Sequence, residues 1–151
     1  MALPTSIELH ILTPDRLVVK EQVDEVEIPG TEGYFGVLPG HTPMLASLAV
    51  GELWYRKGQE KTFLSLAYGF AEVLPDRVTI LAQLAERAEE IDQERAERAR
   101  ERASGRLEGK SDVDYARARI ALMKSLTRLQ VSSRSASGGG PRLKRVHRDG
   151  V

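Results

Sequence analysis

The chain has 151 residues, and its 22 basic and 22 acidic side chains cancel, so net charge gives no reason to expect a nucleic acid or another polyanion as partner. It contains no Cys, which excludes a disulfide framework and a thiolate metal site. No apolar run approaches the roughly 20 residues that a membrane span needs, and the N-terminus shows no signal-peptide pattern, so we expect membrane association only through a partner.

Residues 7–82 contain short apolar and β-branched runs separated by turn signals, which is typical of strands. The runs lie at 7–12, 17–19, 23–28, 44–50, 53–56, 62–66, 68–74 and 78–81. The runs at 53–56 and 62–66 flank Lys57–Glu60, which is a hairpin signal. Short strands with turns every eight to twelve residues or so predict an antiparallel β-sandwich or barrel.

Within this region, Pro29–Leu45 holds four of the thirteen glycines and three of the seven prolines. Glycine permits positive φ and proline fixes φ, so the segment is predicted to turn, form a short apolar run at 34–38 and turn again. Such segments lie at the end of a sheet and often carry contacts. His41 has no evident Ser or Cys partner for catalysis and no metal-ligand spacing with another His, so we expect a contact or turn role for it.

From about Ala82 to Leu107 the chain is mostly Ala, Glu, Arg and Leu, which are strong helix formers. One stripe of the helical wheel collects small side chains and one acid: Ala85, Ala88, Asp92, Ala96, Ala99 and Ala103. Small residues allow close approach by a second helix. Arg95 and Arg102 border the stripe, and together with Asp92 they cost desolvation unless something pairs with them.

A second helix is predicted over about 112–130, with Ser111 and Asp114 resembling a capping box. It has two apolar faces, one with Tyr115, Ala118, Leu122, Leu126 and Leu129, the other with Val113, Ala116, Ile120, Met123 and Thr127. Such a helix must be covered twice, by its hairpin partner and by the sheet or another subunit. The preceding stretch 105–111 is one residue shorter than a phosphate-binding P-loop and follows a helix instead of a strand, so we interpret it as the hairpin turn.

The chain therefore divides into an α+β arrangement of three parts: an N-terminal β-sandwich at 1–84, an antiparallel two-helix hairpin at 85–131 and a disordered basic tail at 132–151. Ser and Gly residues open the tail and Arg, Lys and His residues follow, which is typical of a flexible segment. A basic tail can touch nucleic acid or anionic lipid, but a solvated extension is favoured for one this short.

Several motifs occur together in an order and spacing that are specific to one family. They are Gly30–Gly33, Gly36–Leu45, Ala67–Val73, Ile91–Ala96 and Asp112–Tyr115. On these motifs the chain resembles, over about residues 3–131, the epsilon-subunit family of bacterial F-type ATP synthases.

The resemblance implies a non-catalytic subunit of the rotating central stalk in a proton-translocating synthase. The sandwich would bind the gamma subunit and rest on the c-ring. The hairpin would switch between a folded state and an extended state that reaches the alpha and beta subunits and inhibits ATP hydrolysis. No cofactor is required, although ATP can act as a regulatory ligand. The location implied is the cytoplasmic face of the bacterial plasma membrane, peripheral and held there by the complex.

Site residues follow from the resemblance position by position. The family's ATP-binding motif corresponds to Ile91, Asp92, Arg95 and Ala96, and further contact positions to Glu86, Arg102 and Arg128. Lys124 stands where the strongest binders have Arg, and Lys lacks the planar bidentate fork. The c-ring contacts would come from Glu32, Tyr34 and His41, with Tyr34 in place of a family acid.

Other interpretations remain open from the residues alone. The Arg and Glu residues of the hairpin also fit a solvated face with i,i+4 ion pairs and no ligand. The whole chain also fits a free-standing β-sandwich binding module with a helical docking arm. An enzyme comes third, because no nucleophile and base are evident.

Overall fold

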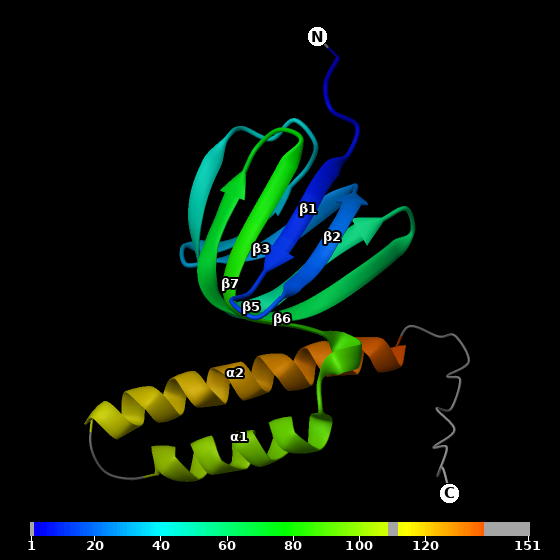
Figure 1. Ribbon diagram of the computed structural model, residues 1–151. Helices are drawn as coiled ribbons and strands as arrows, with labels where there is room; N and C mark the ends of the chain where they lie inside the picture. Colours follow the sequence, from blue (N-terminus) through cyan, green and yellow to red (C-terminus); the bar gives the residue numbers. More distant parts are fainter. Residues whose placement is uncertain (1, 109–111, 138–151) are drawn as a thin grey trace, which may run out of the picture.

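The computed structural model describes residues 2–108 and 112–137. In this part of the chain seven strands precede a short 3-10 helix and two α-helices (Figure 1). The elements are β1 (Ile7–Leu12), β2 (Leu17–Val23), β3 (Glu25–Gly30), β4 (Gly33–Val37), β5 (Met44–Lys57), β6 (Glu60–Val73), β7 (Arg77–Arg87), η1 (Ala88–Glu90), α1 (Gln93–Leu107) and α2 (Asp112–Ser137). The predicted order of a sandwich followed by a helical hairpin is confirmed.

The strands form one sheet in the order β2-β1-β7-β6-β5-β3-β4, which curls into two layers (Figure 1). Neighbouring strands are antiparallel, as predicted, except that β1 pairs with β7 in parallel. Alternate side chains of β1 are buried, which is the pattern expected when one face of a strand lines a core. The core between the layers collects apolar residues from all seven strands.

Two long strands replace four shorter predicted ones, because β5 and β6 each run without interruption for 14 residues. We expected a strand to end at Gly51, but β5 continues through this residue. It is buried, and a Cβ there would lie 2.5 Å from the Tyr34 hydroxyl and 2.6 Å from Pro29. Glycine at this position therefore makes room for the neighbouring strands. The hairpin predicted at Lys57–Glu60 is confirmed by the pairing of those two residues.

A kink in β6 exchanges the two faces of that strand. Tyr68 and Gly69 both have positive φ, of 57° and 140°. Before the kink Leu64 and Leu66 point into the core, and after it the buried positions are Ala71 and Val73. The even-numbered side chains thus change from the inside to the outside, as in a β-bulge.

Gly69→Ala is expected to destabilise the fold by roughly 2–4 kcal/mol, because an added side chain is strained at this φ and has no room. Its Cβ would lie 1.9 Å from the Leu81 carbonyl oxygen of β7. Gly36→Ala is the matched control, since no atom lies within 4 Å of its added Cβ. Chemical denaturation measures both variants, and equal losses of stability would contradict the prediction.

The first helix begins at Gln93 and not near Ala82, so that expectation was wrong. Residues 82–87 continue β7 and pair with β6, from Ala82 opposite Gly69 to Arg87 opposite Leu64. Their helix-forming composition is overridden because the strand completes hydrogen bonds to β6 and buries Ala85 in the core. Ala88 lies in η1 and Asp92 caps α1, so the predicted stripe is helical only from Ala96 onward.

The second helix was predicted to end near Gln130, and this was also wrong, because α2 continues to Ser137. Val131 is fully buried and Arg134 pairs with Glu52 of β5, so contacts with the sandwich extend the helix into the segment that we assigned to the tail. The rest of the predicted tail, 138–151, lies outside the described residues. Of the hairpin turn predicted at 105–111, residues 105–107 still belong to α1, and 109–111, with the Ser111 cap, lie outside the described residues.

The two helices pack along small side chains, as the sequence predicted. Ala96 and Ala103 are the buried residues of α1. On α2 the buried small residues Ala118, Ser125 and Ser132 recur every seven positions, and Gln93 donates a hydrogen bond of 3.2 Å to the Ser132 hydroxyl. By contrast, Tyr115, Ile120, Met123 and Leu126 stay exposed on α2. Neither described helix combines the length and apolarity that crossing a membrane requires.

Candidate functional site

The junction between the sandwich and the hairpin is fixed up to Glu90. Arg87 donates hydrogen bonds to the Tyr55 hydroxyl at 3.4 Å and to the Val18 carbonyl at 3.2 Å. Arg16, after β1, binds both carboxylate oxygens of Glu90, at 3.0 and 2.6 Å. These contacts tie Arg87 and Glu90 to the sandwich.

Hydrogen bonds from Arg16 hold the pKa of Glu90 below its ordinary value. The folded state thus favours the ionised carboxylate. This contribution to stability is fully present above the ordinary pKa of a glutamate, and it is lost as the pH falls through the lowered pKa. The Arg16–Glu90 contact consequently persists at neutral pH.

A small apolar cluster joins the hairpin to the sandwich. Ala88, Ile91 and Val131 are its buried members, and Phe63 of β6 packs against them. This cluster is separate from the much larger core between the two layers. The buried contact between hairpin and sandwich is therefore distinct from the main core.

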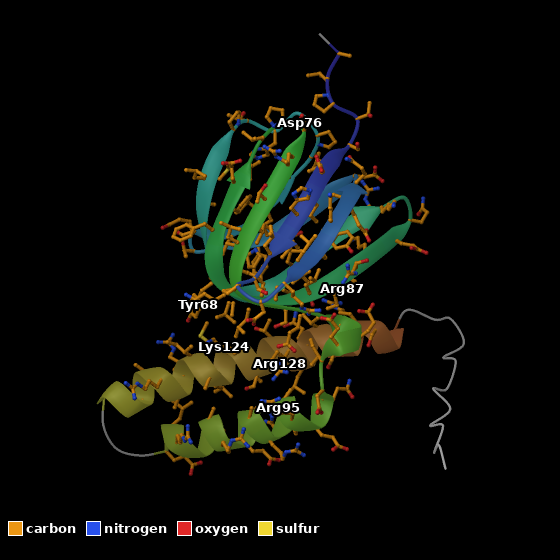
Figure 2. The ribbon with its side chains drawn as sticks, viewed as in Figure 1. Tyr68, Asp76, Arg87, Arg95, Lys124 and Arg128 are labelled. Atoms are coloured by element: carbon orange, nitrogen blue, oxygen red, sulfur yellow. The ribbon has the colours of Figure 1, made fainter. Side chains whose placement is uncertain are left out.

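Two cations of α2 face the sandwich beside this cluster (Figure 2). Arg128 pairs with Glu86 at the end of β7, with Nη2 3.0 Å from Oε2 and Nε 2.9 Å from Oε1. The Nε contact does not meet hydrogen-bond geometry, so this buried atom has ion-pair contact only. One turn earlier, the Lys124 ammonium lies 5.5 Å from the centre of the Tyr68 ring.

The other residues predicted to bind ATP are distributed over the hairpin. Asp92 is the N-cap of α1 and accepts the Arg95 backbone N–H at 3.0 Å. The Arg95 side chain lies between the helices in Figure 2 and is exposed, as is Arg102. Ile91 and Ala96 are buried, in the small cluster and in the seam between the helices. The structure thus brings Glu86 and Arg128 together and leaves Arg95 and Arg102 open to solvent.

The residues predicted to contact the c-ring differ in exposure and in the contacts they make. Tyr34 is 58% exposed, and its hydroxyl accepts the Glu52 N–H over the middle of β5. Glu32 is exposed in the turn before β4. His41 is half-buried, and its Nδ1 donates to the Thr42 carbonyl at 2.7 Å.

The loop around His41 belongs to the end of the sandwich that lies far from the helices. The neighbouring Gly40 N–H donates to the Pro75 carbonyl in the turn between β6 and β7, at 2.7 Å. Figure 2 labels Asp76 of that turn at the far end. This hydrogen bond places the loop of His41 at the end of the sandwich that lies far from the helices.

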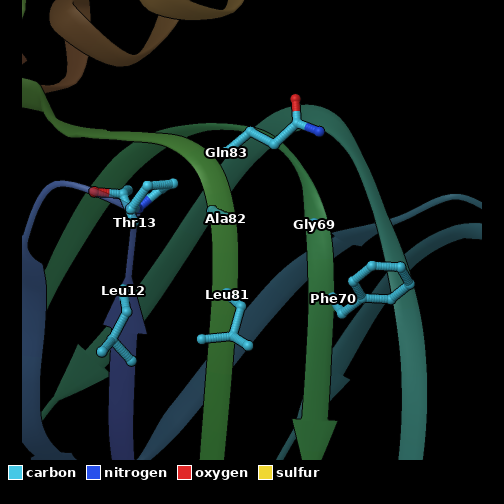
Figure 3. Close-up of a pocket in the computed structure, with 8 residues that line it drawn as sticks. Leu12, Thr13, Gly69, Phe70, Leu81, Ala82 and Gln83 are labelled. Carbon is cyan, nitrogen blue, oxygen red and sulfur yellow. The ribbon is translucent and has the colours of Figure 1, made fainter.

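Sequence reasoning missed an outer apolar stripe, which we define as Leu12, Phe70 and Leu81. Phe70 is opposite Leu81 in the register of β6 and β7, and Leu81 is opposite Leu12. Phe70 is 66% exposed and Leu81 is 56% exposed. Figure 3 shows the three side chains on adjacent strands, beside a cleft of about 420 Å³ that Thr13, Pro14, Gly69, Ala82 and Gln83 complete. The sequence signal for this stripe was the glycine in Tyr68-Gly69, because the kink at these two residues turns Phe70 outward.

A second cleft, of about 530 Å³, lies between the helices. Glu94, Glu97 and Glu101 line it together with Gln93, Arg98, Leu129 and Ser132. Three carboxylates disfavour a phosphate there. Among the described residues no group of three or more His, Asp or Glu is placed to hold a metal ion.

Comparison with known proteins identifies relatives over most of the chain. The family model described as "ATP synthase, Delta/Epsilon chain, beta-sandwich domain" matches residues 6–88, and the "long alpha-helix domain" of the same family matches 89–133. The ATP synthase epsilon chain of Nitratidesulfovibrio vulgaris strain DP4 is 50% identical over 127 residues, which cover 83% of this chain and 95% of the relative. The epsilon chain of Syntrophobacter fumaroxidans is 52% identical over 130 residues, covering 85% and 97%.

Two solved structures share the fold of this chain. A chain in the Euglena gracilis mitochondrial ATP synthase, from the structure of its OSCP, F1 and c-ring in rotational state 1, has a TM-score of 0.76 at 28% identity and covers 90% of this chain and 84% of its own. A chain of the Tetrahymena thermophila central stalk and c-ring has a TM-score of 0.56 at 13% identity, which shows the shared fold alone.

Proposed function

The chain belongs to the ATP synthase delta/epsilon family, as an epsilon chain without a catalytic site of its own, and from this premise we propose that it couples the catalytic head to the c-ring and restrains ATP hydrolysis through its hairpin. The separate cluster of Phe63, Ala88, Ile91 and Val131 carries the regulatory part of this proposal. It makes the hairpin a docked unit that can undock. Identity near 50% to epsilon chains favours this stalk role over a free-standing module.

Undocking starts from a defined pivot. Arg16 and Arg87 hold the chain as far as Glu90, whereas Ile91 and Asp92 have extended backbone between η1 and α1. Rotation at these two residues would free α1 and α2 toward the alpha and beta subunits. Side chains from both apolar faces of α2 are exposed and available for that contact, Tyr115 and Leu126 on one and Ile120 and Met123 on the other.

We assign the gamma subunit to the outer apolar stripe. Leu12, Phe70 and Leu81 lie on three adjacent strands, and two of them are more than half exposed. Contiguous exposed apolar side chains of this kind mark protein interfaces, because their burial against a partner releases water. Leu84 of β7 is also exposed near the stripe.

We assign the c-ring to the end of the sandwich far from the hairpin. His41 lies at that end. The exposed Glu32 and Tyr34 are further candidate contacts. Binding of the c-ring would place the chain at the cytoplasmic face of a bacterial plasma membrane, peripheral and attached through the complex.

ATP sensing is the remaining part of the proposal. Arg95, Arg102 and Lys124 can meet phosphates, and the second carboxylate oxygen of Asp92 can accept from the base or ribose. Glu86 already neutralises Arg128, so Arg128 contributes less to phosphate binding than a free cation would. ATP favours the folded state only as far as it binds that state more tightly than the extended one.

Arg95→Ala is expected to weaken ATP binding by the isolated full-length chain about tenfold, because one charge-assisted contact to phosphate is lost. Asp92→Ser tests the carboxylate while keeping a residue that caps α1. Arg98→Ala is the control, since Arg98 pairs with Glu94 on the same helix. Titration calorimetry measures all three variants. If the unmutated chain shows no heat of binding with ATP, the site does not exist here.

A further inference from the structure

The last turns of α2 make a contact that neither the motif residues nor the small apolar cluster explains. Arg134 presents two nitrogens to Glu52 of β5, with Nε 3.2 Å from Oε2 and Nη2 3.2 Å from Oε1. This paired arrangement is the geometry in which Arg recognises a carboxylate with most directional specificity. We propose that Arg134 and Glu52 form a latch that holds the hairpin closed, a proposal that rests on the proposed opening of the hairpin.

The carboxylate is buried at this contact. Glu52 is 8% exposed, although it lies outside the core between the two layers. Its cross-strand neighbour Ser65 is buried as well, and α2 packs against both of their strands. Burying a carboxylate costs free energy unless a partner compensates it. The closed hairpin therefore both removes Glu52 from water and supplies the cation that pairs with it.

Arg134 is held from a second side. Its guanidinium carbon lies 5.1 Å from the centre of the Phe63 ring. Phe63 also packs against Ile91 at the pivot and Val131 on α2. The latch and the small cluster are thus one connected contact surface, so weakening either favours opening at the pivot.

Only one of the two side chains lies within the residues that the family models match. The family's helical model matches residues 89–133, and Arg134 follows it directly. Glu52, by contrast, lies within the part matched by the sandwich model. A chain whose α2 stops at the end of the family match would keep the buried acid position and lack this cation.

The experiment counts closed and open molecules of the full-length chain. Because the chain has no Cys, spin labels can be attached to Gln59→Cys in the turn after β5 and to Glu101→Cys on α1, both at exposed positions. Pulsed electron paramagnetic resonance then gives the distribution of distances between the label on the sandwich and the label on the hairpin. Glu52→Gln and Arg134→Gln are each expected to raise the ratio of open to closed molecules about fivefold.

The double variant decides whether the two side chains act as a pair. Glu52→Gln with Arg134→Gln is expected to open no further than either single variant, since the interaction is lost only once. Glu94→Gln is the matched control, because it breaks the exposed pair with Arg98 on α1 and leaves the sandwich untouched. Three outcomes would overturn the latch. The effects of the two changes could be additive, the single variants could stay as closed as the control, or the unmutated chain could be mainly open.

The outcome is independent of the proposed inhibition, which is measured as ATP hydrolysis. If removal of the hairpin raises ATP hydrolysis but neither substitution changes the distance distribution, the latch is refuted and the inhibition stands. If the two substitutions change the distance distribution but removal of the hairpin leaves ATP hydrolysis unchanged, the latch stands and the inhibition is refuted.

Discussion

Removal of residues 91–151 is expected to raise ATP hydrolysis by the reassembled synthase about fivefold or more, the range of typical coupling between a regulatory element and an active site. The cut follows Glu90, because Glu86 and Arg87 belong to β7 and an earlier cut would damage the sandwich. The contacts of Arg16 with Glu90 and of Arg87 with Tyr55 remain. The truncated chain should therefore still assemble.

Two measurements accompany this truncation. Assembly is checked by co-isolation with the gamma and c-ring subunits, and hydrolysis is then compared at equal content of assembled enzyme. A chain shortened only by 138–151 is the control, since it keeps both described helices. Unchanged hydrolysis after removal of the hairpin from a fully assembled enzyme would refute inhibition by the hairpin.

Leu81→Asp is expected to weaken binding to the gamma subunit about a hundredfold, because a charge would be buried at the centre of an apolar contact. Leu81 stands between Leu12 and Phe70 in the register of the stripe, so the change affects its middle. Phe70→Asp should act in the same direction. Surface plasmon resonance with purified gamma subunit measures both variants.

Leu38→Asp is the matched control for this second prediction. Leu38 is 55% exposed, compared with 56% for Leu81, but it follows β4 and lies outside the stripe. The control should bind gamma as the unmutated chain does. Equal losses in Leu81→Asp and Leu38→Asp would show that the stripe is not the interface.

Local patterns predicted the elements whose own residues decide their structure. The alternation in β1 and the turn signal at Lys57–Glu60 were sufficient for those strands, since one buried face and one tight turn leave little choice. The small-residue seam was also correct for Ala96 and Ala103, because close helix packing depends on the size of the side chains.

Local patterns failed where two structures compete for the same residues. Residues 82–87 have helix-forming composition, yet they complete the pairing of β7 with β6. The end of α2 resembled a flexible tail, yet burial of Val131 and the Glu52 contact of Arg134 extend the helix. In both places the deciding partner is distant in sequence, and short-range propensity carries no information about it.

By itself, the sequence determined the order of sandwich and hairpin, the motif residues and the small seam between the helices. Only the tertiary structure decided which side chains face outward as a stripe, because the kink at Tyr68 and Gly69 reverses the faces of β6. It also decided that Glu86 and Glu52 pair with cations of α2, since such pairs join residues 42 and 82 positions apart. Contacts between residues so far apart in sequence depend on how whole strands and helices pack. A local sequence pattern therefore cannot predict them.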